Sequence, residues 1–227
     1  MVLKIYLARH GQDEDNAAGI LNGHRNEPLT KLGIEQAQTV ANKIVQQGLK
    51  FNKIYSSPLQ RAYDTAKIIA SATSTTNNNN GGDDVEIMDL LIERDFGIMT
   101  GTPTKEIKER CSSNGYNVLE TSTITYFLSP NGAETFPQLI QRGNIVIDQI
   151  QSIYKEQNQK QDDHDDYSIL LVTHGDFGKM LYAAYYKLDW KDVLKQFHFG
   201  NSEVLLLSKD SSPNNNAHVF TIQQYNS

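Results

Sequence analysis

Apolar runs that suit buried strands alternate along this chain with segments whose apolar residues recur at helical spacing. The strand-like runs cover residues 2–7, 51–56 and 167–173. Two further runs, 202–208 and 218–224, flank an Asn-rich stretch and predict a hairpin. Alternating strands and helices favour a mainly parallel sheet with helices on both faces. The pattern therefore predicts an α/β fold, a three-layer α/β/α sandwich.

Three helices are predicted, and two of them have clear start or stop signals. Thr30 precedes an apolar stripe at helical spacing, and Gly48 supplies a stop. Ser57 and Gln60 have the spacing of a capping box, which predicts a second helix with Pro58 in its first turn. A third and longer helix is predicted over the apolar positions of 136–153.

Polar, low-complexity stretches interrupt this pattern at residues 71–84, 157–166 and 211–217. Such segments cannot bury a core, so we expect them to be surface loops. A length of 227 residues suits one full-sized core. We therefore expect a single domain over 1–227, without internal repeats.

Composition narrows the class of partner. With 38% hydrophobic and 21% charged residues, the chain has the composition of a soluble globular protein without a membrane span. A net charge of −6 argues against a surface that binds a nucleic acid polymer or an anionic membrane. The lone Cys111 cannot form an internal disulfide, which suits a reducing compartment. We expect a cytoplasmic protein that binds a small molecule; the sequence does not fix its oligomeric state.

Basic and imidazole side chains follow three of the predicted strands. Arg9 and His10 end the first, Ser57 and Arg61 follow the second, and His174 follows the last. In open α/β sheets, ligands bind beyond the carboxyl ends of the strands. Arginines beside helix N-termini predict a site for phosphate or a similar dianion.

Such a cluster is also suited to catalysis. A neutral imidazole is a nucleophile at physiological pH, and arginines can neutralise the charge of a transferring phosphoryl group. The product would be a phosphohistidine. An alkoxide leaving group needs a proton, and Glu93 in "LLIERDFGIMTG" is the candidate donor, which we expect at the rim of the pocket.

Successive motifs carry a resemblance to a known family. The stretches "ARHG", "GHRNEPLTKLGIEQA", "YSSPLQRAYDTA", "LIERDFGIMTG" and "VTHGDFG", with Asn16 after the first, resemble the histidine phosphatase superfamily in its phosphoglycerate mutase-like branch. They span residues 3–178 in the family's order. The resemblance implies no metal and no cofactor.

The resemblance also implies site roles. His10 is expected to be the phosphorylated nucleophile and Glu93 the proton donor. The expected phosphate pocket consists of Arg9, Arg61 and His174, supported by Asn16. Asn22, Gly23 and Gly175 are further substrate-binding candidates, and Asn201 resembles a family position near the pocket.

One position departs from the family pattern. Three residues after the nucleophile, where the family usually has serine or threonine, this chain has Asp13. A carboxylate there would repel a phosphate. We expect Asp13 either to turn away or to meet a cationic or hydroxyl-rich part of a substrate.

Other side chains offer alternatives. Asp176, near the second histidine, is the rival proton donor, as in the acid phosphatase branch, although Gly175 holds the adjoining place. His24 lies in a loop where it could touch substrate. His164 lies in an acidic run that imitates a metal site but is typical of a solvated face. His198 and His218 receive no role.

The sequence favours a phosphatase that hydrolyses a small phosphate monoester. The alternatives are a phosphoglycerate mutase-type phosphoryl transfer and a catalytically silent phospho-ligand sensor. Mutases of this branch carry paired arginines for the substrate carboxylate, whereas Arg94, Arg110 and Arg142 occur singly here. A sugar phosphate, sugar bisphosphate, nucleotide or phosphoamino acid would each fit the motifs.

Overall fold

The computed structural model describes residues 2–73, 85–159 and 166–207. The strands are β1 (Leu3–Arg9), β2 (Lys53–Ser56), β3 (Val85–Ile87), β4 (Val118–Glu120), β5 (Thr125–Phe127), β6 (Tyr167–Thr173) and β7 (Val204–Leu207). The α-helices are α1 (Glu14–Ala18), α2 (Lys31–Gln46), α3 (Gln60–Thr73), α4 (Ile107–Ser113), α5 (Phe136–Asn158), α6 (Gly175–Tyr186) and α7 (Trp190–Gln196). Short 3-10 helices cover Asp89–Leu91, Gly97–Met99 and Thr104–Glu106.

The main sheet has the strand order β3-β2-β6-β1-β7. The first four strands are parallel and β7 runs antiparallel to β1, which confirms the prediction of a mainly parallel sheet. Arg9 pairs with Thr173 in the register of β1 and β6, and Ser56 pairs with Val172 across β2 and β6. The residues that follow these three strands therefore meet at one edge of the sheet.

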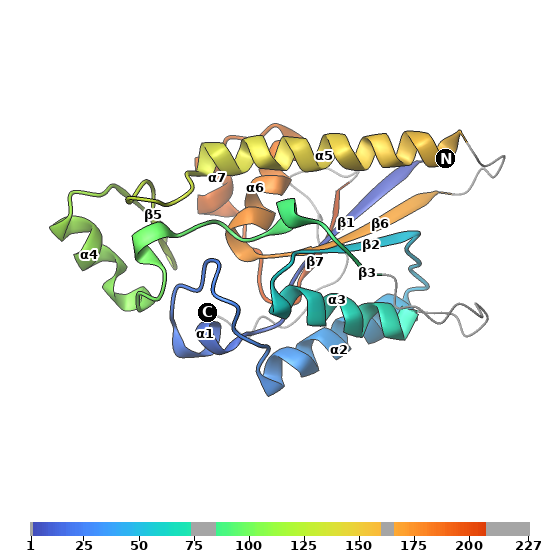
Figure 1. The fold of residues 1–227 in the computed structure, drawn as a ribbon, viewed down its shortest axis with the longest axis horizontal. Helices are drawn as coiled ribbons and strands as arrows, with labels where there is room; N and C mark the ends of the chain where they lie inside the picture. Colours follow the sequence, from blue (N-terminus) through green and yellow to red (C-terminus); the bar gives the residue numbers. More distant parts are fainter. Residues whose placement is uncertain (1, 74–84, 160–165, 208–227) are drawn as a thin grey trace.

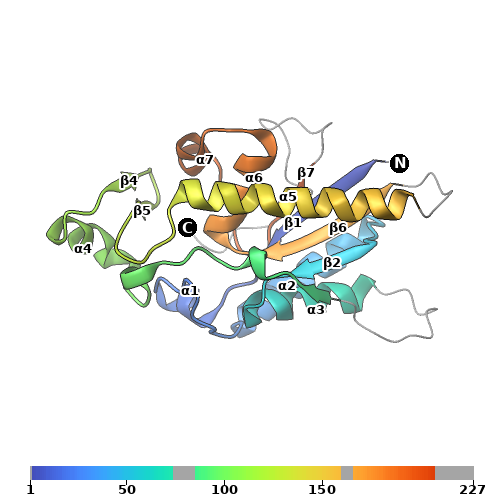
Figure 2. The same cartoon turned by 45° about the horizontal axis from the view of Figure 1, so that its top comes forward.

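Helices cover both faces of this sheet (Figures 1 and 2). On one face, Leu7 and Leu171 pack in a core with α5, α6 and α7. On the other, Ala8 and Val172 pack against α2 and α3. Successive strand residues point to opposite faces, and each large apolar side chain buried there contributes about 1.5–3 kcal/mol. The predicted α/β/α sandwich is confirmed.

The start of α2 is as predicted, and the start of α3 is not. The Thr30 side chain accepts a hydrogen bond from the Gly33 N–H and caps α2. α3 begins at Gln60, two residues later than predicted, and the Gln60 N–H donates to Asn26 at 2.7 Å. The predicted Ser57–Gln60 capping box is wrong, because the Ser57 hydroxyl accepts the Leu59 N–H at 3.2 Å and lies 2.7 Å from His174 Nε2 instead.

The first residues of two predicted loops are helical. Residues 71–73 form the last turn of α3, and 157–158 end α5. Most of the first two predicted loops, all of the loop at 211–217 and the predicted strand at 218–224 lie outside the described residues. In the part of the chain that is described, no helix is long and apolar enough to span a membrane.

The segment between β3 and α5 extends beyond the carboxyl ends of the parallel strands. Figures 1 and 2 show α4 and the β4–β5 pair there, on the side of α1. These elements have a small apolar cluster of their own, which includes Phe96, Ile107 and Phe127. The segment therefore lies on the side of the sheet edge that carries the polar side chains.

Candidate active site

Two histidines meet at the carboxyl ends of β1 and β6. The rings of His10 and His174 have centroids 5.0 Å apart, and both side chains are buried. His174 is the N-cap of α6, so the positive end of that helix dipole also faces the edge. The strand register thus brings together the candidates that the sequence placed at separate strand ends.

Hydrogen bonds fix the form of His10. Nδ1 lies 2.6 Å from the carbonyl oxygen of Gly11, which can only accept, so Nδ1 carries the proton. Nε2 then carries the lone pair, which accepts a hydrogen bond from Arg61 Nε at 3.3 Å. Burial, followed by the charges of Arg61 and Arg9, lowers the pKa of His10 well below 6.5. His10 is therefore a neutral imidazole whose Nε2 is unprotonated.

His174 has a partner that sequence reasoning did not assign. Its Nε2 lies 2.7 Å from the hydroxyl of Ser57, while its buried Nδ1 has no hydrogen-bond partner among the described residues. Burial and the charge of Arg61 lower the pKa of His174 well below 6.5. The position of Ser57 at a strand end is the available signal, but its spacing to Gln60 predicts a helix cap instead.

The two arginines are held by backbone carbonyls. Arg9 Nη1 donates to the carbonyl oxygen of Phe199 at 2.8 Å, and its buried Nε has no hydrogen-bond partner in the described ranges. Arg61 is fully buried and donates to the carbonyl oxygens of Arg25 at 2.6 Å and Gly23 at 2.9 Å. Gly23 therefore contacts Arg61 through its backbone.

The remaining polar candidates form a connected group. The Asn201 amide donates to the Asn16 Oδ1 at 3.1 Å, which joins the loop before β7 to α1. Asn22 donates to the carboxylate of Asp13 at 2.7 Å. That carboxylate does not turn away from the site: it is fully buried, and its Oδ2 lies 3.1 Å from Arg61 Nε.

Glu93 lies inside the protein and not at a rim, so the predicted position was wrong. It is 5% exposed, and its Oε1 accepts the N–H groups of Arg94 at 2.8 Å and Phe177 at 3.0 Å. Burial and the nearby charge of Asp176 raise the pKa of Glu93, and these hydrogen bonds oppose the shift only in part. Because α6 supplies the Phe177 N–H, the carboxyl group is anchored beside the helix that His174 caps.

The rival Asp176 has a different environment. Its carboxylate lies 3.4 Å from Arg94 Nη1, and its side chain is 17% exposed. Arg94 also donates to the carbonyl oxygens of Glu134 and Phe127, and its guanidinium lies over the Phe136 ring. Arg94 therefore pairs with Asp176 and not, through its side chain, with Glu93.

Arg142 on α5 is a further residue that sequence reasoning missed. Its guanidinium donates to the carbonyl oxygens of Leu90, Ile92 and Glu93 and pairs with Glu134. No sequence pattern indicates this contact, because Arg142 and Glu93 are 49 residues apart.

The surroundings of His24, Gly175 and Lys179 are also defined. His24 Nε2 lies 2.8 Å from the carbonyl oxygen of Glu93, so its loop contacts the segment of the candidate acid. Gly175 lies under Arg9, where an added Cβ would be 3.4 Å from the guanidinium carbon. Lys179 is buried, lies 2.7 Å from the Tyr126 hydroxyl, and has its pKa lowered by burial to about 8.

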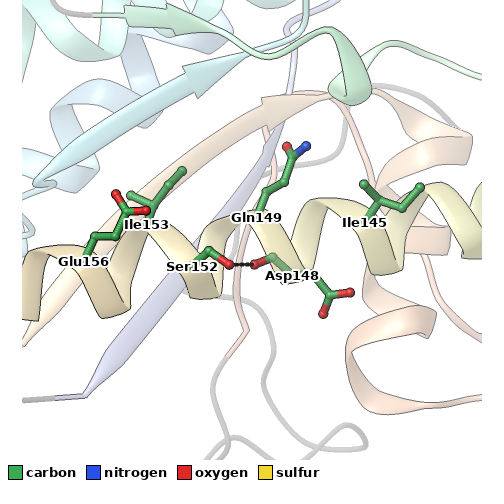
Figure 3. A pocket seen from close by; sticks show the side chains of 6 residues that line it. All are labelled: Ile145, Asp148, Gln149, Ser152, Ile153 and Glu156. Atoms are coloured by element: carbon green, nitrogen blue, oxygen red, sulfur yellow. Dashed lines mark hydrogen bonds between the residues drawn. The ribbon is translucent and has the colours of Figure 1, made fainter.

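Other features lie apart from this site. His164 and His218 are outside the described residues, and within those residues no group of three or more His, Cys, Asp or Glu could hold a metal. A surface pocket on α5 is lined by Ile145, Asp148, Gln149, Ser152, Ile153 and Glu156 (Figure 3). Its lining includes none of the residues at the strand ends, so it is not the candidate active site.

The fold and the site define a class: an α/β sandwich with two neutral histidines and two arginines at the carboxyl ends of parallel strands. Residues 5–217 match the family model of the histidine phosphatase superfamily, branch 1. The chain belongs to that superfamily, as its motifs predicted.

Relatives in the superfamily include phosphatases and mutases. The chain is 30% identical over 181 residues to a metal-independent phosphoserine phosphatase of Arabidopsis thaliana, a match that covers 80% of this chain and 68% of the relative. It is 29% identical over 140 residues to a 2,3-bisphosphoglycerate-dependent phosphoglycerate mutase of Parvibaculum lavamentivorans, which covers 61% of this chain and 62% of the relative.

Solved structures share the fold. A mycobacterial glucosyl-3-phosphoglycerate phosphatase has a TM-score of 0.71 and 22% identity, with 99% of this chain and 98% of the other covered. A phosphoserine phosphatase from Entamoeba histolytica has a TM-score of 0.63 and 25% identity, with 90% and 89% covered.

Proposed function

We propose that the protein is a phosphatase that hydrolyses a small phosphate monoester through a phosphohistidine at His10. The observation that carries the proposal is the protonation state of the His10 imidazole. Gly11 holds the Nδ1 proton, so the lone pair of Nε2 points into a site that Arg61 lines. A lowered pKa keeps this nucleophile neutral at physiological pH.

The remaining residues have complementary roles in this reaction. Nε2 of His10 attacks phosphorus, and the bond from phosphorus to the ester oxygen breaks. Arg9, Arg61 and His174 hold the phosphoryl oxygens, with Asn16 in support. Glu93 gives its proton to the leaving oxygen, which its raised pKa favours.

Water then completes the cycle. The Glu93 carboxylate takes a proton from the water that attacks phosphorus, and the bond to His10 Nε2 breaks. Inorganic phosphate leaves, and His10 and Glu93 return to their starting protonation states. No step needs a metal or an organic cofactor.

The arginines outside the pocket favour hydrolysis over mutase-type transfer. Arg94 and Arg142 donate to backbone carbonyls and pair with Asp176 and Glu134, so neither is a ready partner for a substrate carboxylate. A silent sensor would have no use for the buried acid Glu93 beside a neutral nucleophile.

The names of the relatives narrow the substrate class. They include enzymes for phosphoserine and for glucosyl-3-phosphoglycerate, so phosphorylated metabolites are the first compounds to test. We also propose a cytoplasmic location, because the lone Cys111 suits a reducing compartment, and a single-domain organisation. Neither nucleic acid nor a membrane is an expected partner.

Trapping the intermediate tests the proposal. The enzyme is mixed briefly with radiolabelled phosphoserine or a labelled sugar phosphate, quenched in alkali and digested for peptide mapping. Acid-labile label on His10, and none with His10→Ala, is the expected result. Label on His174, Asp13 or a serine, or label passed to a second substrate without release of phosphate, would overturn it.

A further inference from the structure

A carboxylate lies inside the candidate phosphate pocket. Asp13 is fully buried, and its Oδ1 accepts the Asn16 N–H at 2.7 Å to cap α1. Its Oδ2 accepts the Asn22 amide at 2.7 Å and lies 3.1 Å from Arg61 Nε. The group therefore has defined partners on both oxygens.

Asp13 and the nucleophile share one donor. Arg61 Nε lies 3.1 Å from Asp13 Oδ2 and 3.3 Å from His10 Nε2. A phosphoryl group on Nε2 would lie against the same N–H group, and therefore beside the Asp13 carboxylate. Two anions that lie against the same N–H group in a buried site repel each other strongly.

We propose that Asp13 is a specificity residue that pairs with Arg61 and must accept a proton before a phosphate-like dianion binds tightly. The inference rests on the proposed function for its substrate, but the step concerns anion binding alone. In its neutral form the carboxyl group donates its O–H to an anion oxygen, as a hydroxyl side chain would. The proton comes from solvent and returns there when the anion leaves.

The surroundings of Asp13 fit this exchange. The cations that face it are Arg61 from α3 and Arg9 from β1, and both favour the charged form, as do the hydrogen bonds from Asn16 and Asn22. Burial outweighs them and raises the pKa of Asp13. Protonation of Asp13 therefore costs less free energy than protonation of an exposed aspartate.

Sulfate is a suitable probe, because it keeps two negative charges across the working pH range whereas phosphate titrates. Sulfate affinity is measured by calorimetry between about pH 5 and pH 8 for the wild type, Asp13→Thr and Asp13→Asn. Threonine and asparagine both cap helices, so these variants keep the start of α1. Circular dichroism and thermal melts establish that each variant is folded.

The wild type should lose up to about tenfold in sulfate affinity per pH unit above the pKa of Asp13. The two variants should lose this slope and bind sulfate at least about tenfold more tightly near pH 8. Equal slopes in the wild type and in a folded variant would overturn the inference.

A second measurement does not depend on those variants. The dependence of the binding enthalpy on buffer gives the number of protons taken up with sulfate. Uptake of about one proton by both the wild type and His10→Ala is expected; no uptake, or uptake lost in His10→Ala, would overturn the inference. If the wild-type protein binds sulfate with this pH dependence but hydrolyses no phosphate monoester, that result would contradict the proposed function alone.

Discussion

Arg142 donates a hydrogen bond to the carbonyl oxygen of Ile92 at 2.6 Å, one residue before the candidate acid. The same guanidinium forms a two-point ion pair with Glu134, at 3.0 and 2.7 Å. α5 thereby fixes the backbone that carries Glu93. Arg142 therefore holds in place the backbone of the residue that we propose as the proton donor.

Arg142→Lys should lower kcat about tenfold or more on a sugar phosphate and much less on p-nitrophenyl phosphate. One factor of ten corresponds to about 1.4 kcal/mol of barrier, a scale that misplacement of a general acid can reach. Kinetics on both substrates measure the effect. The control is Arg110→Lys, since that exposed arginine pairs only with Glu106 in the described contacts and should leave both rates unchanged. An equal loss on the two substrates would indicate a merely structural role.

Glu93→Gln should show the same selectivity more strongly. Protonation matters most for a poor leaving group, so a loss of about a hundredfold or more is expected on a sugar phosphate. The loss on p-nitrophenyl phosphate, whose phenolate leaves readily, should be far smaller. Asp176→Asn should lack this selectivity; if it shows the selectivity and Glu93→Gln does not, Asp176 is the donor.

The fall of kcat/KM at acidic pH should have its midpoint well below pH 6.5. Protonation removes the lone pair of His10 Nε2, but burial and the charges of Arg61 and Arg9 lower the pKa of His10. Activity should therefore persist as the pH falls through 6.5 and be lost only near the depressed pKa. A pH profile with p-nitrophenyl phosphate measures this, and a midpoint at or above pH 6.5 would contradict it.

Turnover should survive removal of divalent metals. The charge of the phosphoryl group is balanced by Arg9 and Arg61 in the proposed reaction, so no Lewis acid has a role. Rates before and after treatment with EDTA measure this. Loss of activity that one added divalent ion restores would refute the prediction.

Gly178→Ala should destabilise the protein by about 1–3 kcal/mol through overpacking. An added Cβ would lie 2.3 Å from Cε1 of Phe199, a fully buried ring. Because the Phe199 carbonyl accepts Arg9, kcat/KM should also fall. Denaturant unfolding and kinetics measure the two effects, and Gly178→Ala with Phe199→Leu should recover part of the stability. Wild-type stability in Gly178→Ala would show that the ring can move.

Local sequence patterns were enough to predict the layers of this fold and the residues at its sheet edge. Strand runs that alternate with helical stripes require a mainly parallel sheet, and parallel strands bring their carboxyl ends together. His10, Arg61 and His174 therefore had to converge, because their positions along the chain follow directly from the strand ends. The Thr30 cap was readable for the same reason, since it involves only neighbouring residues.

The contacts of the individual side chains could not be predicted in this way, because they form between elements that are far apart in the chain. Ser57 bonds His174 from 117 residues away, so its spacing to Gln60 was misleading. Glu93 is buried, and α6 satisfies its carboxylate with an N–H group from 84 residues away. Asp13 faces Arg61, although a local pattern allowed it to turn away. These contacts depend on burial and on partners from other elements, which short-range spacing does not encode.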